Sequence, residues 1–324
     1  MAVAVGLPVS LGAWLDAMTI ASLGAIGAMT IVYMPRTALG HRASTLMAVA
    51  FAMTACYALG QVSQLVPPIR VPVVGAVAVV TTLACRYYRV VPPGPLFLVM
   101  ATAIGAYAPG QIDDMPFRLG VFALGTIGAV AVGFVYSVHM LRRRAPLPVS
   151  PPPQDMVAAA IDSLIIGVFV GLSLAIAQGL SIEKPYWAPV SCLAVIQGVS
   201  LRAVWIRQAE RTVGTLLGLG LTWGVILVAT DPWAIALALV VLTFCIETAI
   251  VRQYAFAAMF ITPLTILLAE TSSLGSVATS TLLAARFADT VVGALAGLLG
   301  GIFLHSSALR RIPRRRLQSA SDEG

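Results

Sequence analysis

Long apolar stretches recur from one end of this chain to the other, and they limit the fold more than any other feature. Hydrophobic residues fill 59% of the 324 positions and charged residues only 10%, whereas a soluble domain has about 25% charged residues. A helix that crosses a bilayer needs roughly 20 apolar residues. The sequence therefore predicts an all-α membrane protein with about twelve transmembrane helices, the first of them short. We expect the helices at residues 2–16, 17–35, 43–63, 70–86, 94–109, 117–139, 157–179, 185–202, 212–230, 232–251, 254–269 and 282–304.

The basic residues are divided unevenly between the two sides of these predicted helices. Of the 20 lysine and arginine side chains, 16 fall on one side, and the other four are Arg70, Arg118, Lys184 and Arg286. Because cytoplasmic loops are enriched in lysine and arginine, we expect both termini to be cytoplasmic in a multi-pass protein of the inner membrane. The net charge of +7 follows from these loops, so the lipid bilayer rather than a nucleic acid is the expected partner.

The second half of the chain resembles the first. FRLGVFALGTIGAVAVGFVY (117–136) matches RFADTVVGALAGLLGGIFLH (286–305), and HRAST (41–45) falls where ERTVGT (210–215) does. Each copy would have six helices, an even number, so both would enter the membrane in the same orientation, related by an axis along the membrane normal. The expected parts are a first repeat (1–140), a Pro-rich cytoplasmic linker (141–155), a second repeat (156–305) and a basic cytoplasmic tail (306–324).

The most specific motif lies in the second repeat. Residues 185–220 read PYWAPVSCLAVIQGVSLRAVWIRQAERTVGTLLGLG, with an aromatic pair at the start, three arginines and then glycines one turn apart. In wording and spacing this stretch resembles the signature of the fusaric-acid-resistance (FUSC) family, the aromatic acid exporters. The resemblance implies a secondary, proton-coupled exporter whose substrate is an aromatic or other organic anion. Plant aluminium-activated malate channels look like distant relatives, so a passive organic-anion channel is one alternative and a non-transporting membrane scaffold is another.

The three arginines of this motif are candidates for substrate binding. Arg202, Arg207 and Arg211 are expected at the cytoplasmic ends of two consecutive helices. Guanidinium groups bind carboxylates through paired hydrogen bonds, so the three could form a vestibule that collects an organic anion. Anchoring to lipid headgroups is the alternative, because any cytoplasmic loop would carry arginines.

Arg118, Arg286 and Trp187 are the other candidates for substrate binding. The internal repeat aligns Arg118 with Arg286, and all three residues are expected near the outer leaflet. The two arginines could flank the exit of an anion pathway, or they could simply reach the interface with their charged ends. Trp187 is equally compatible with the belt of aromatic residues at a membrane surface.

Carboxylates inside predicted membrane helices are candidates for proton coupling. Glu247 lies in LTFCIETAIVRQ, and Asp289 lies three residues after Arg286, on the same helix face. An ionised carboxylate in a membrane helix needs a cationic partner, a cavity or a proton. We expect Glu247 or Asp289 to carry the coupled proton, with a structural ion pair as the alternative. Asp162 is a rival for either role.

Several motifs typical of enzymes and metal sites are missing from the sequence. The sequence has no GxxxxGK[ST], GxSxG or HExxH motif, and its four cysteines lie in apolar runs without metal-ligand spacing. We therefore expect no enzyme activity, metal or cofactor. Glycines spaced by four allow close helix packing, within the chain or in a homodimer, and a periplasmic adaptor is a further expected partner. The N-terminus looks like the later part of a first helix, which suggests a start upstream of Met1.

Overall fold

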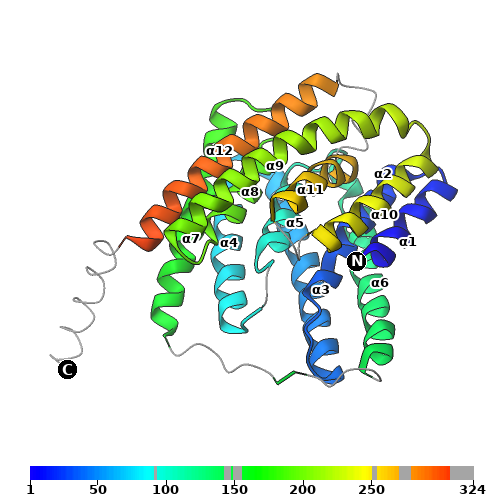
Figure 1. Cartoon of the computed structure of the whole chain (residues 1–324), viewed down its shortest axis with the longest axis horizontal. Coiled ribbons are helices and arrows are strands. Elements are labelled where there is room, and N and C mark those ends of the chain that lie inside the picture. The colour runs from blue at the N-terminus through cyan, green and yellow to red at the C-terminus, as the bar shows by residue number, and fades with distance from the viewer. Residues whose placement is uncertain (91–92, 142–146, 149–154, 250–253, 270–278, 307–324) are drawn as a thin grey trace.

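A computed structural model describes residues 1–90, 93–141, 147–148, 155–249, 254–269 and 279–306 (Figure 1). Helices make up nearly all of this part of the chain. Most of the expected linker (141–155) and tail (306–324) lies outside the described residues. Within them the chain forms twelve α-helices and no strand, which confirms the predicted all-α class. The helices are α1 (Ala2–Trp14), α2 (Met18–Ala28), α3 (Leu39–Val62), α4 (Arg70–Tyr87), α5 (Leu96–Ala106), α6 (Met115–Leu141), α7 (Met156–Gly179), α8 (Trp187–Ile196), α9 (Leu201–Val228), α10 (Pro232–Ala249), α11 (Tyr254–Ala269) and α12 (Thr279–His305).

The described helices fall into two length classes. Seven are long and apolar enough to cross a bilayer: α3, α4, α6, α7, α9, α10 and α12. The others, α1, α2, α5, α8 and α11, are shorter apolar helices. Helix α8 has 10 residues and therefore rises about 15 Å, half of the roughly 30 Å hydrocarbon core of a bilayer. The protein is thus a multi-pass membrane protein that contains half-length helices as well as full spans.

Sequence reasoning misplaced the junction between the eighth and ninth helices. The stretch predicted as one helix over 185–202 ends at Ile196, and the next helix begins at Leu201 instead of 212. The early start of α9 has a local cause, because the Ser200 hydroxyl accepts a hydrogen bond from the Ala203 backbone N–H and caps the helix. The three candidate arginines that follow Ser200 therefore all belong to α9 rather than to the ends of two helices.

Packing within each half of the chain follows one scheme. In the first half α2 packs on α6, and α3 packs on both α5 and α6; in the second half α8 packs on α12, and α9 packs on both α11 and α12. Figure 1 shows the orange and red α12 lying across α8 and α9. Gly297 of α12 permits this approach, since a Cβ there would lie 2.5 Å from the Cys192 carbonyl oxygen of α8. Gly293, Gly297 and Gly301 are glycines spaced by four on α12, and Gly297 shows that this spacing serves close packing inside the chain.

Among the described helices, the main contacts between the two halves are α4 with α7, α1 with α10, α5 with α8 and α2 with α11. If α1 is matched with α7, α2 with α8 and so on to α6 with α12, then the α4–α7 contact corresponds to the α1–α10 contact. In the same way the α5–α8 contact corresponds to the α2–α11 contact. The α4–α7 contact includes an ion pair, because Arg86 Nη1 lies 2.7 Å from Asp162 Oδ2. Asp162 is therefore a partner in a structural ion pair between the halves.

Candidate functional site

Trp187, the first residue of α8, is enclosed in the protein. Its side chain is 2% exposed, whereas Trp14, Trp205, Trp223 and Trp233 are all more than half exposed. The interpretation of Trp187 as part of an interfacial aromatic belt is therefore wrong, although it suits the other tryptophans. Burial follows from the position of α8, whose ten residues are all buried among neighbouring helices. A large flat aromatic surface thus stands inside the helix bundle.

Arg286 of α12 covers this aromatic surface. Its guanidinium carbon lies 3.6 Å from the centre of the Trp187 ring, and its Nη2 donates a hydrogen bond of 3.0 Å to Thr265 Oγ1 on α11. The arginine is only 3% exposed. A desolvated cation over an indole ring gains about 2 kcal/mol, which offsets part of the loss of hydration. Three helices, α8, α11 and α12, therefore hold a positive charge inside the bundle.

A carboxylate accompanies this cation. Asp289 lies three residues after Arg286, so both side chains share one face of α12, and Asp289 is fully buried. It is close enough to the Tyr107 hydroxyl of the first half to interact with it electrostatically. Beside Trp187 and Arg286 there is a cavity of only about 10 Å³, which is about the space of one water molecule. A solute would therefore need the helices to open.

A second buried arginine contacts α8 one turn further along. Arg211 of α9 is 3% exposed, and its Nη2 donates a hydrogen bond of 3.2 Å to Ser191 Oγ. Ser191 follows Trp187 by four residues, so both lie on the same side of α8. Among the described residues neither Arg211 Nε nor Thr215 Oγ1, one turn on in α9, has a hydrogen-bond partner. Arg211 and Thr215 therefore have hydrogen-bonding groups still available inside the bundle, on the α9 side of α8.

The structure does not bring the three arginines of α9 together. Arg202 is exposed and Arg207 half-buried, while Arg211 is buried. Arg202 and Arg211 are nine residues apart, about two and a half helical turns, so they point to opposite sides of α9. The three-arginine vestibule expected from the sequence is therefore not assembled, because a single continuous helix replaces the predicted loop.

Arg118 occupies a setting unlike that of Arg286. It is 7% exposed, and its guanidinium donates hydrogen bonds to the carbonyl oxygens of Ala108 (3.2 Å), Gln111 (2.6 Å) and Pro109. These acceptors belong to the connection between α5 and α6. Backbone oxygens already occupy much of its donor capacity, so Arg118 fastens this connection.

Glu247 does not have the buried setting that the sequence suggested. It lies two residues before the end of α10, and its side chain is 40% exposed. Its Oε1 atom is 2.5 Å from the Met1 nitrogen, where α1 packs on α10. A carboxylate near a helix end can reach the polar headgroup region, so Glu247 needs no proton to be tolerated there.

Sequence reasoning missed several polar and aromatic neighbours of the site. Tyr107 of the first half lies 5.9 Å from Tyr186, which lies 5.2 Å from Trp187, measured between ring centres. Arg70 covers the other end of this row, 5.0 Å from the Tyr107 ring centre. Ser191 was detectable, because it follows Trp187 by one helical turn. The contribution of the first half was not, since nothing in the sequence pairs Tyr107 with α8.

Comparisons with known proteins agree with this picture. Residues 165–300 match the family described as "Fusaric acid resistance protein-like". This part of the chain is fusaric acid resistance protein-like. Trp187, Ser191, Arg211, Arg286 and Asp289 all lie within this FUSC-like region.

One curated relative is the "Uncharacterized membrane protein YvaC" of Bacillus subtilis (strain 168), 29% identical over 157 residues. The matched stretch covers 48% of this chain and 24% of that protein, so the chain spans about a quarter of the length of its relative. No solved structure matches. The comparisons thus confirm the predicted resemblance to the FUSC family, and they show a similarity to another membrane protein.

Proposed function

We propose that this protein carries small organic anions, foremost aromatic carboxylates, across the membrane as a secondary exporter. The observation that supports this most is the buried Arg286 guanidinium 3.6 Å above the Trp187 ring, with a buried Asp289 on the same helix face. Ionisable groups inside membrane segments are costly and typically mark transport pathways. An aromatic carboxylate would use both features, its carboxylate on the guanidinium and its ring against the aromatic side chains.

Helix α8 supports a pathway past this site. Half-length helices near the midplane are typical of substrate sites in secondary transporters, where a helix N-terminus faces an anion. Trp187 is the first residue of a half-length helix, and the two buried arginines contact it one turn apart. We propose that the anion passes between Arg286 and Arg211 when the helices around α8 separate.

The two halves support a repeat with one working site. Helices of corresponding order share their packing partners, and five of the six pairs also share their length class. We propose two six-helix repeats related by an axis along the membrane normal. Arg118, the counterpart of Arg286, is hydrogen-bonded to backbone carbonyls, so we assign the anion site to the second repeat alone.

Asp289 is our preferred candidate for the coupled proton. Glu247 is 40% exposed near a helix end, whereas Asp289 is fully buried beside the proposed anion site. A carboxylate in that position changes the net charge around Arg286 whenever it gains or loses a proton. Its protonation can therefore alter anion binding, which is the minimum that coupling requires.

Orientation and partners complete the proposal. We propose a protein of the inner membrane with both termini in the cytoplasm, acting with a periplasmic adaptor and as a homodimer. Cysteines introduced at Ser150 and Ser319 should react only with reagents that reach the cytoplasm. Labelling of either one from outside would contradict the orientation.

Transport by the purified protein in vesicles tests the proposed function. Labelled benzoate should exchange across proteoliposomes, and Trp187→Leu should slow the exchange strongly while Trp223→Leu, at a tryptophan 57% exposed on α9, should not. Asp289→Asn should remove the response to a pH gradient of either sign but keep the exchange. Exchange in wild type without any response to pH would favour the passive channel. No exchange of any organic anion, with protein correctly inserted, would favour the scaffold.

A further inference from the structure

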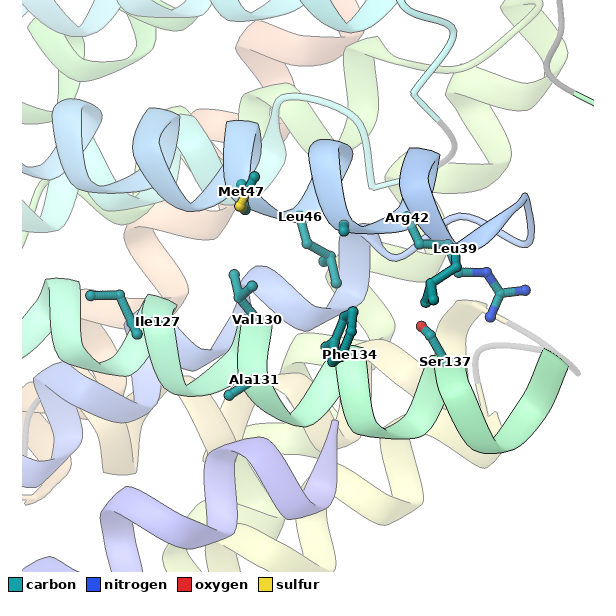
Figure 2. Close-up of a pocket in the computed structure, with 10 residues that line it drawn as sticks. Leu39, Arg42, Leu46, Met47, Ile127, Val130, Ala131, Phe134 and Ser137 are labelled. Carbon is teal, nitrogen blue, oxygen red and sulfur yellow. The ribbon is translucent and has the colours of Figure 1, made fainter. Parts of the chain in front are cut away.

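An apolar groove lies in the first half of the chain, and none of its lining residues belongs to the Trp187–Arg286 site. It has a volume of about 370 Å³ and runs between α3 and α6 (Figure 2). Its lining consists of Leu39, Arg42, Ala43, Leu46, Met47, Ile127, Val130, Ala131, Phe134 and Ser137.

Polarity in this groove is confined to one end. Arg42 and Ser137 lie together at that end, and Ile127 and Met47 lie at the other (Figure 2). The Ser137 hydroxyl already donates to the Gly133 carbonyl. The walls between the two ends are aliphatic or aromatic, and Met47, Ile127 and Phe134 are each about half exposed or more. The groove is therefore open and apolar along its length, with the Arg42 guanidinium at one end.

Arg42 has donors to spare. Its Nε donates to the Thr37 carbonyl oxygen at 2.7 Å, which fixes the side chain beside the start of α3. Within the described part of the chain, its two Nη groups make no hydrogen bond, and Figure 2 shows them directed beyond the start of α3. Two neighbouring N–H groups of a guanidinium match the oxygens of a phosphate.

The length of the groove fits one leaflet of a bilayer. From Ser137 to Ile127 the α6 wall spans ten residues, or about 15 Å at 1.5 Å per residue. Half of the roughly 30 Å hydrocarbon core is the same length. A molecule with its charge at Arg42 and its apolar part along α6 would therefore lie at the depth of a lipid.

We propose that this groove binds an anionic phospholipid, with its phosphate at Arg42 and an acyl chain between α3 and α6. Charge complementarity favours this occupant over a second copy of the chain, whose apolar helix would bring no counter-charge to Arg42. The match in length favours it over a small aromatic anion, which cannot reach both ends. In the predicted orientation this lipid belongs to the cytoplasmic leaflet, where anionic lipids and basic side chains meet.

Lipid retention on the purified full chain tests this proposal. Mass spectrometry of the intact protein should show phosphatidylglycerol held in preference to phosphatidylcholine. Arg42→Gln should lower that preference about fivefold, as expected for one arginine at an anionic headgroup, and Arg42→Lys should restore part of it. Arg89→Gln, at an exposed arginine of the α4 terminus outside the groove, should leave it unchanged.

A steric variant tests the acyl-chain contact separately. Ala131 is exposed, so Ala131→Trp fills the groove without repacking the core and should remove the retained lipid; Val80→Trp, on exposed α4 surface, is the matched control. Retention equal to wild type in both Arg42→Gln and Ala131→Trp would overturn the proposal. Displacement of the lipid by benzoate would identify a solute site instead, and loss of a dimer in Ala131→Trp would identify a subunit interface. If Arg42→Gln does not fold, Ala131→Trp decides alone.

Discussion

Replacing Gly297 by alanine should weaken the contact between α12 and α8. A Cβ at Gly297 would lie 2.5 Å from the Cys192 carbonyl oxygen and 3.0 Å from Val195 Cβ, while ordinary contact begins at 3.4 Å. The helices would have to move apart by about 0.9 Å, the difference between 3.4 and 2.5 Å. Both obstructing atoms are close to the backbone of α8, so no flexible side chain can give way. Overpacking of this kind costs about 1–3 kcal/mol.

Gly224→Ala provides the matched control. A Cβ at Gly224 of α9 meets nothing within 4 Å, so this variant changes helix propensity without a steric conflict. Alanine gains about 1 kcal/mol over glycine in a helix interior, and the gain is shared by both variants. The difference between them therefore isolates the steric term, and we expect Gly297→Ala to be less stable than Gly224→Ala by about 1–3 kcal/mol.

Chemical unfolding in detergent or in a mixed micelle, followed by circular dichroism, measures this difference. Gly297→Ala should also alter the exchange of organic anions, because α8 carries Trp187 into contact with Arg286. Equal unfolding free energies for the two alanine variants would refute the close approach of α8 and α12. Reduced stability with unchanged exchange would refute the link between this contact and the site.

Three further substitutions probe individual contacts. Ser191→Ala should lower the free energy of unfolding by about 1–3 kcal/mol, because the buried Arg211 guanidinium loses an acceptor; an unfolding curve matching wild type would contradict this. Arg118→Gln should destabilise the α5–α6 connection, lowering the free energy of unfolding by about 2 kcal/mol or more. The exchange rate per folded molecule, measured in vesicles, should stay unchanged. A selective loss of exchange would instead make Arg118 part of the pathway. A double-mutant cycle of Arg86→Gln and Asp162→Asn should give a coupling energy of about 0.2–1 kcal/mol, since the Arg86 side chain is 35% exposed. No coupling in low salt would mean that the pair does not join the halves.

The helix pattern could be predicted from the sequence because each span is a run of apolar residues limited by turns or charges. The expected 70–86 and 254–269 helices, for example, correspond to α4 (Arg70–Tyr87) and α11 (Tyr254–Ala269). Hydropathy did not locate the end of α8, because the four residues QGVS (197–200) that separate it from α9 form too short a polar break to stand out between apolar stretches. The decisive signal was local, the Ser200 cap that starts α9 early.

The site was only partly predictable for a related reason. Arg286, Asp289 and Trp187 could be named because charged and aromatic residues are rare in these helices, yet burial of each depends on which helices surround it. Arg202 and Arg211 have the same chemistry but face opposite sides of α9, a difference that appears only once the helix is known to be continuous. Likewise, the exposure of Glu247 follows from the packing of α10 at the edge of the bundle, about which the local sequence LTFCIETAIVRQ says nothing.

The exchange of an aromatic carboxylate by Arg286→Gln tests the central claim most directly. Glutamine keeps a hydrogen-bond donor for Thr265 but removes the charge above Trp187, so the loss of one charge-assisted interaction of about 1.5–3 kcal/mol should slow the exchange of labelled benzoate at least tenfold. Arg89→Gln, which removes an exposed arginine, should exchange at the wild-type rate. Benzoate exchange at the wild-type rate in correctly inserted Arg286→Gln would contradict the proposal that organic anions cross the membrane at this arginine.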